Sequence, residues 1–212
     1  MIDPWLLAAG LQLGLGAAAP IGPVNVEIVR RTLGHGRPAG IRLGLGAVSV
    51  DVACAAAVSL GLRPLAHSGA LLAVLAVMGA AVLAWLGVMS LRAARARFRG
   101  GGDPVGASSS VGRHYRTGLL MTATNPMTLA FWFAAVPGTV AQLTDEPARD
   151  LPLVCAGVGA GALAWVLAFT SVVAWLGRRR PRWLFIAADA AGGLILLAFA
   201  GVVVWRFAAP VL

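Results

Sequence analysis

Long apolar runs separated by short connections constrain the fold of this chain more than any other feature. Six such runs span residues 5–30, 39–62, 69–91, 115–136, 151–176 and 183–205. A helix of about 20 apolar residues crosses a hydrocarbon core of about 30 Å. Only 12% of the residues are charged, against roughly 25% in soluble domains, and mean hydropathy is +0.84. The sequence therefore predicts an all-α membrane protein with six transmembrane helices.

The basic residues are distributed unevenly around these runs. All seventeen are Arg, and fourteen flank the first, third and fifth connections, against Arg63, Arg149 and Arg206 elsewhere. Since cytoplasmic loops carry the basic excess, we expect a multi-pass plasma (inner) membrane protein with both termini outside. The Arg residues lie between apolar runs rather than on one polar face, so we expect the lipid bilayer and not nucleic acid as the partner of this charge.

Enzymatic and cofactor chemistry finds no support in the sequence. The two Cys and three His are scattered, and no Ser-His-Asp or Cys-His arrangement is present. We therefore expect no enzyme activity, no cofactor and no bound metal. A membrane thiol-redox carrier would need Cys54 and Cys155 to meet, and we interpret these residues instead as small apolar fillers.

A weak internal repeat divides the chain into two halves. The pair Gly44-x-Gly46 recurs 115 residues later as Gly159-x-Gly161, and Pro23 has a partner 103 residues later in Pro126. Three spans per repeat make the halves inverted relative to each other in the membrane. The expected organisation is a first three-helix repeat at 1–102, a cytoplasmic Gly/Ser-rich linker at 103–112 and a second three-helix repeat at 113–212. The small-x3-small patterns in these runs predict close helix contacts within the chain or in a homodimer.

The first and fourth runs are each interrupted by Pro. Pro20-Ile21-Gly22-Pro23 breaks the first run and precedes Asn25, and Asn125-Pro126 breaks the fourth. Corresponding interruptions in two halves of a transporter point to its binding site, and Asn amides can both donate and accept hydrogen bonds there. We therefore expect helices 1 and 4 to be broken at Pro. The predicted substrate-binding residues are Gly22, Pro23, Asn25, Asp51, Asn125 and Pro126.

Three carboxylates fall within the apolar runs and are candidates for proton or cation coupling. Asp51 lies in the middle of the second run with no Arg within a helical turn, and Asp189 has no local partner. Intramembrane acids usually face an internal cavity and function there. Glu27 precedes Arg30 and Arg31 by three and four residues, which is the spacing of helix ion pairs. Glu27 is therefore either a cytoplasmic-side ion-pair partner or a pathway residue.

The motifs together resemble a known family. The segment Ala19-Pro20-Ile21-Gly22-Pro23-Val24-Asn25, the pattern Gly44-x-Gly46-x4-Asp51 and the pairs Asn125-Pro126 and Phe131-Trp132 resemble the lysine exporter superfamily, the LysE/RhtB type of amino-acid efflux translocator. The resemblance covers nearly the whole chain. It implies a secondary transporter that exports amino acids or related small metabolites. Two departures matter: Ile21 separates Pro20 from Gly22, and Met127 stands where the family often has Lys, so the substrates of better-known members are not carried over.

The leading hypothesis from the sequence is a proton-coupled exporter of small-molecule substrates that works by alternating access. Carboxylates and carbonyls along the pathway favour cations or ammonium groups over anions, so amino acids, with cationic ones as a candidate class, are the expected cargo. The alternative is a metal-cation exporter that uses the same intramembrane carboxylates. That alternative requires Asp51 and Asp189 to lie close enough to share an ion.

Overall fold

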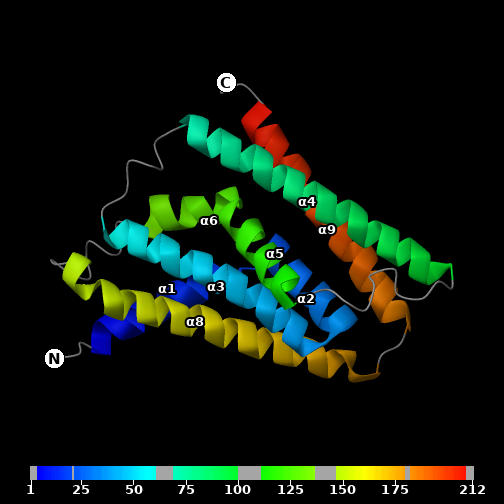
Figure 1. Ribbon diagram of the computed structural model, residues 1–212, viewed down its shortest axis with the longest axis horizontal. Coiled ribbons are helices and arrows are strands. Elements are labelled where there is room, and N and C mark those ends of the chain that lie inside the picture. The colour runs from blue at the N-terminus through cyan, green and yellow to red at the C-terminus, as the bar shows by residue number, and fades with distance from the viewer. Residues whose placement is uncertain are drawn as a thin grey trace.

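The computed structural model describes residues 4–20, 22–60, 69–99, 111–136, 147–179 and 182–208, and the regular secondary structure within these ranges is helical (Figure 1). In chain order the elements are α1 (Pro4–Ala18), α2 (Pro23–His35), α3 (Arg37–Ser59), α4 (Gly69–Phe98), α5 (Val111–Ala123), α6 (Pro126–Ala130), the π-helix η2 (Phe131–Ala135), α8 (Pro147–Leu176), the 3₁₀-helix η3 (Gly177–Arg179) and α9 (Arg182–Ala208). The predicted all-α class is confirmed.

Several of these helices are long and apolar enough to cross a membrane. Four qualify singly, at 37–59, 77–98, 149–176 and 185–205, and α1 with α2 forms a fifth candidate as a bent pair. The predicted run at 115–136 corresponds to α5, α6 and η2, each shorter than a complete span. The chain is therefore a multi-pass helical membrane protein with four or five candidate spans in its described part. Most of the predicted linker at 103–112 lies outside the described residues.

Proline residues coincide with the starts of helices rather than with helix interiors at the two interruptions. The chain leaves α1 at Ala18 and enters α2 at Pro23, with Gly22 as the N-cap residue. It leaves α5 at Ala123 and enters α6 at Pro126, where the side chain of Asn125 accepts a hydrogen bond of 3.1 Å from the amide of Met127. Pro fits the first helical position because it has no N–H to satisfy there.

The helices pack as two outer pairs around a central set. On one side α1 lies against α8, and on the other α4 lies against α9. Between them α3 packs against both α5 and α8, while α2 contacts α3, α8 and α9 (Figure 1). One apolar cluster joins α3, η2 and α8 around Trp132, and a second joins α4, α5 and α9 around Met121. The central helices α2, α3 and α5 are therefore covered on both sides.

Glycine residues set the closest helix approaches. A Cβ built on Gly14 of α1 would overlap the carbonyl oxygen of Val158 in α8, and one built on Gly118 of α5 would overlap that of Leu43 in α3. Gly157 and Gly161 of α8 likewise face α1. The small-x3-small pattern in this helix is therefore used for packing within the chain.

We expect Gly118→Ala to destabilise the protein. The added methyl group must push α5 away from α3, and overpacking of this kind costs about 1–3 kcal/mol. Gly201 of α9 is the matched control because a Cβ there meets nothing within 4 Å, so Gly201→Ala should be neutral or slightly stabilising. Thermal unfolding of the two purified variants in detergent checks the prediction. Equal midpoints would contradict the α3–α5 contact.

Large apolar side chains cover the outer surface. Exposed examples on α4, α8 and α9 include Val77, Trp85, Trp175, Leu194 and Val204. Water-soluble proteins rarely expose contiguous apolar patches of more than a few hundred Å². The outer faces of these helices are therefore suited to contact with lipid.

Candidate functional site

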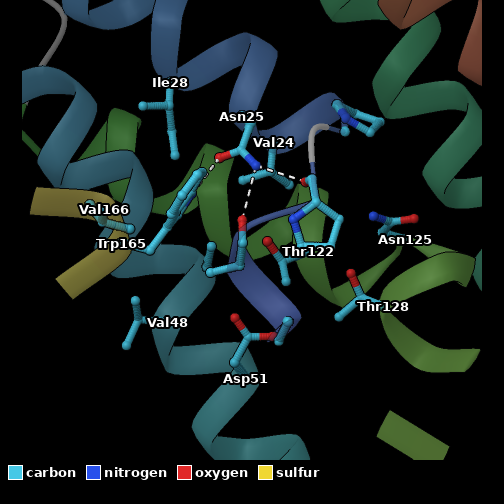
Figure 2. A pocket seen from close by; sticks show the side chains of 16 residues that line it. Val24, Asn25, Ile28, Val48, Asp51, Thr122, Asn125, Thr128, Trp165 and Val166 are labelled. Carbon is cyan, nitrogen blue, oxygen red and sulfur yellow. Dashed lines mark hydrogen bonds between the residues drawn. The ribbon is translucent and has the colours of Figure 1, made fainter. Parts of the chain in front are cut away.

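A cavity lies where the two interruptions meet the long helices α3 and α8 (Figure 2). Its volume is about 70 Å³. The residues that line it come from both halves of the chain: Ala17, Ala18, Pro20, Gly22, Pro23, Val24, Asn25, Ile28, Ala47, Val48, Asp51, Thr122, Asn125, Thr128, Trp165 and Val166. The helix interruptions thus bring backbone and polar side chains into the interior of the bundle.

Asp51 supplies the negative charge of this cavity. Its side chain projects from α3 into the cavity (Figure 2), and the residue is 5% exposed. The indole N–H of the fully buried Trp132 donates a hydrogen bond of 2.9 Å to Oδ1 of Asp51. Trp132 lies on the π-helix η2, and π-helical turns often occur at functional sites. Among the described residues no Arg forms an ion pair with Asp51, so its charge is available to a ligand.

Asn25 organises the interruption between α1 and α2. Its side-chain amide donates to the carbonyl oxygens of Ala18 and Pro20, at 2.9 Å and 2.8 Å, while its Oδ1 accepts from the indole N–H of Trp165 at 3.3 Å. Carbonyl groups at a helix end have no partner within the helix. Asn25 therefore satisfies the end of α1 and ties it to α8 through Trp165.

Three of the residues that line this cavity carry hydrogen-bond donors without partners in the described part of the chain. Thr122 is 3% exposed, and its hydroxyl oxygen has no hydrogen-bond partner in the described part of the chain. The amides of Val24 and Asn25 lie in the first turn of α2, before the first helical bond, which runs from Val26 N to Gly22 O. Such first-turn amides carry the positive end of the helix dipole. The cavity thus combines one carboxylate with a hydroxyl and a helix N-terminus.

Five of the six predicted substrate-binding residues line this cavity. They are Gly22, Pro23, Asn25, Asp51 and Asn125, while Pro126 begins α6 directly after Asn125. Asp51 is the predicted coupling acid that lies here, whereas Glu27 and Asp189 are absent from the lining.

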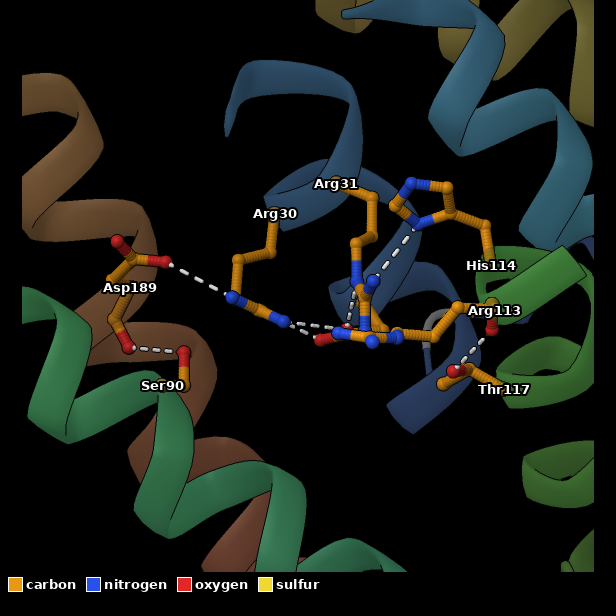
Figure 3. A network of polar contacts seen from close by, with 8 residues as sticks. Arg30, Arg31, Ser90, Arg113, His114, Thr117 and Asp189 are labelled. Atoms are coloured by element: carbon orange, nitrogen blue, oxygen red, sulfur yellow. Dashed lines mark hydrogen bonds and ion pairs between the residues drawn. The ribbon is translucent and has the colours of Figure 1, made fainter. Parts of the chain in front are cut away.

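A separate buried network of charges lies around Arg30, Arg31 and Asp189 (Figure 3), and Glu27 belongs to it through its ion pairs with both Arg residues. Glu27 is fully buried and accepts two hydrogen bonds of 2.7 Å from Arg30 and one of 2.6 Å from Arg31. Arg31 also donates to Nδ1 of His114 on α5, at 2.8 Å. Because Arg is only a donor, Nδ1 of His114 must be the acceptor. The ion pairs allowed by the sequence spacing are therefore formed within α2, and the hydrogen bond from Arg31 to His114 connects α2 to α5.

Asp189 extends this network to the outer helix pair. Its Oδ1 lies 3.6 Å from Nη1 of Arg30, and its Oδ2 lies 3.3 Å from Nε of Arg97 on α4. The hydroxyl of Ser90 on α4 donates to the backbone carbonyl of Asp189 at 2.8 Å. The guanidinium of Arg97 also lies over the ring of Phe185. Four helices, α2, α4, α5 and α9, are thus joined by buried charges and polar groups.

Sequence reasoning did not assign roles to Thr122, Thr128 and Trp165 in the cavity, and it noted Trp132 only as part of an aromatic pair. For Trp165, the available signal was the position of a Trp in the middle of an apolar run. The two Cys are free thiols, with Cys54 buried, and the weak Sγ contact of Cys155 is to the carbonyl of Val52. This arrangement gives no support to a thiol-redox carrier.

The family model for LysE type translocators matches residues 15–206. This chain belongs to the LysE type translocator family. The match includes both interruptions, Asp51 and the buried charge network, so the residues described above fall within the shared domain. The LysE-type resemblance that the sequence motifs indicated is confirmed.

Two curated relatives of this LysE type translocator match most of its length. YcgF of Bacillus subtilis, which is provisionally named an amino acid efflux protein, is 28% identical over 162 residues, covering 73% of this chain and 74% of the relative. ChpE of Pseudomonas aeruginosa, named a chemotactic transduction protein, is 27% identical over 201 residues, covering 92% and 96%. No solved structure matches the chain. The family and the efflux name together identify an efflux-type transporter.

Proposed function

We propose that this LysE type translocator exports amino acids or related small metabolites across the plasma membrane by proton-coupled alternating access. The observation that carries the proposal is the cavity around Asp51, which lies at the two helix interruptions. Interrupted helices in corresponding places of two halves form the binding sites of many secondary transporters. The name of YcgF points to the same class of cargo.

Helix packing supports two inverted three-helix repeats as the moving parts. Gly118 follows Gly14 by 104 positions, and Val158 follows Leu43 by 115. Gly14 approaches the carbonyl of Val158, and Gly118 approaches the carbonyl of Leu43, so the same contact occurs twice with the halves exchanged. This exchange is what a two-fold axis in the membrane plane would produce. The proposed repeats are 1–102 and 113–212.

In this proposal the buried charge network closes one side of the transport pathway. Arg97 and His114 lie near the ends of α4 and α5 at the third connection, and Glu27 and Asp189 lie about two turns from the ends of α2 and α9 that border the first and fifth connections. The basic excess around these connections supports a cytoplasmic position for them, with both termini outside. We propose that the network holds α2 against α5 and α9 when the cytoplasmic side is closed, and that its ion pairs separate when that side opens. Asp51 then carries the substrate ammonium group and the coupling proton in turn.

No specific observation favours the alternative of a metal-cation exporter. It required Asp51 and Asp189 to share an ion, yet Asp189 is paired with Arg30 and Arg97 outside the Asp51 cavity. Within the described ranges no group of three or more His, Cys, Asp or Glu side chains is placed to hold a metal ion. A homodimer remains a prediction of the sequence.

Reconstitution into liposomes tests the proposal. We expect proteoliposomes preloaded with labelled amino acids to release at least one of them faster than protein-free liposomes that are preloaded in the same way. Acidifying the outside should accelerate release, because inward proton flow drives export, and a protonophore should remove the acceleration. Release that responds to sodium and not to pH would overturn the proton coupling. No release of any amino acid would overturn the proposed function.

A further inference from the structure

We propose that the Asp51 cavity selects zwitterionic amino acids with small uncharged side chains and excludes cationic amino acids. The inference rests on the proposed function and deepens it. The ammonium group of the substrate binds Asp51, and its carboxylate binds the Thr122 hydroxyl and the first-turn amides of α2. The assignment follows from which polar groups line the cavity and from which charged groups are absent from its lining.

A single acid limits the positive charge that the cavity accepts. Asp51 is the one carboxylate among the lining residues, and Trp132 already occupies its Oδ1. One ammonium group can therefore bind the carboxylate, but a second positive charge on a substrate side chain would have no partner. The other intramembrane acids are engaged, since Glu27 binds Arg30 and Arg31. Burying an unpaired charge costs far more free energy than burying a small apolar group gains, so lysine and arginine are excluded.

Donors without partners indicate where the substrate carboxylate binds. The Thr122 hydroxyl is buried, unpartnered and part of the cavity lining. A buried hydroxyl without a partner is unfavourable, and a ligand oxygen would remove that penalty. The α2 N-terminus lines the same cavity through Val24 and Asn25, and first-turn amides favour anionic groups. Two independent features thus favour a substrate carboxylate in the same cavity as the Asp51 ammonium site.

The remaining wall limits the side chain. Ile28, Ala47, Val48 and Val166 form an apolar surface next to the Trp165 ring. The cavity volume of about 70 Å³ is several-fold below the 300–1,000 Å³ of pockets for drug-sized ligands. Only a short side chain fits beside the ammonium and carboxylate groups, which makes glycine, alanine and serine the expected substrates.

Competition in proteoliposomes with the native protein tests this assignment. We expect labelled alanine to undergo counterflow, and unlabelled glycine and serine to compete with it. Ethanolamine lacks the carboxylate, lactate lacks the ammonium group and lysine carries a second positive charge, so none of these three should compete at the same concentration. Counterflow of lysine or arginine equal to that of alanine would overturn the inference and leave the proposed transporter standing. If the native protein moves no amino acid, the proposed function itself fails.

The Thr122→Val variant tests the contact with the substrate carboxylate in a protein that should still fold. The change keeps the shape and removes the hydroxyl, so we expect the alanine concentration for half-maximal transport to rise about tenfold to a hundredfold, the effect of losing a hydrogen bond to a charged group. Thr170→Val is the matched control, because the Thr170 hydroxyl is fully buried and bonded to Val166 O within α8. Equal half-maximal concentrations in the two variants would overturn the role of Thr122.

A second variant tests the size limit without touching a polar contact. Ile28 is 1% exposed and lines the cavity, so Ile28→Ala should enlarge the space for the substrate side chain. We expect valine and leucine to compete with alanine in this variant, although they compete weakly in the native protein. Unchanged selectivity in a folded Ile28→Ala protein would contradict the proposed wall.

Discussion

Replacing Asp51 with Asn is expected to remove most of the transport activity while the protein stays folded. The amide of Asn keeps an oxygen that accepts the hydrogen bond from Trp132, so the contact between α3 and η2 survives. The negative charge that binds the ammonium group is lost. Truncating one partner of a buried charge pair costs about 2–5 kcal/mol, and every 1.4 kcal/mol is about tenfold. We therefore expect the initial rate of efflux at low substrate concentration to fall at least about 30-fold.

Asp150→Asn is the control for Asp51→Asn. Asp150 lies in the first turn of α8, away from the cavity lining, and its neutral variant should transport at the native rate. Unfolding temperatures of all three proteins should be compared before the rates are interpreted. Native transport by a folded Asp51→Asn protein would contradict the binding role of Asp51 and its role in coupling.

Replacing Glu27 with Gln is expected to cause a large loss of stability. Glu27 is fully buried between Arg30 and Arg31, which are themselves 8% and 6% exposed. The neutral side chain would leave the two buried guanidinium groups without the negative charge that both contact. Removing one partner of a buried ion pair costs about 3–5 kcal/mol. Denaturant unfolding in detergent micelles should therefore show a much lower midpoint.

Arg116→Gln provides the comparison for the Glu27 variant. Arg116 is exposed on α5, and the loss of an exposed charge usually changes stability by less than about 0.5 kcal/mol. Similar midpoints for Glu27→Gln and the native protein would contradict the network in Figure 3. The network would then be unable to hold α2 against α5 and α9.

The helices were largely predictable because hydropathy reports burial in lipid directly. The run predicted at 151–176 lies within α8 (Pro147–Leu176), and the run at 183–205 lies within α9 (Arg182–Ala208). The backbone of a membrane span must satisfy its own hydrogen bonds, so a long apolar run has few alternatives to a helix. The fourth run was predictable as helical, but its division into α5, α6 and η2 was visible only at Asn125-Pro126.

The partners of the polar residues were much less predictable. Asp51 was identified from its position in an apolar run, whereas its bond to Trp132 joins residues 81 positions apart. The ion pairs of Glu27 with Arg30 and Arg31 follow from helical spacing, but the approach of Arg97 to Asp189 depends on how α4 and α9 pack. These spans are apolar on most faces, so their sequence pattern does not fix the rotation of each helix. Contacts between helices therefore required the structure.

Both departures from the family motif are close in sequence to residues that line the cavity. Met127, where the family often has Lys, follows the α6 start and is 62% exposed, so no cation stands at this position beside Asn125. Pro20 and Gly22, which flank the inserted Ile21, both line the cavity. Each departure thus lies within two residues of a proposed substrate-binding residue along the sequence, Ile21 beside Gly22 and Met127 after Asn125.

A structure determined at saturating alanine tests the central claim most directly. Our account predicts a bound amino acid in the Asp51 cavity, with its ammonium group within hydrogen-bond distance of Asp51 and its carboxylate beside Thr122 and the first turn of α2. The same preparation of Asp51→Asn should show an empty cavity. A bound amino acid elsewhere in the protein, or one that binds equally in the Asp51→Asn variant, would contradict the account.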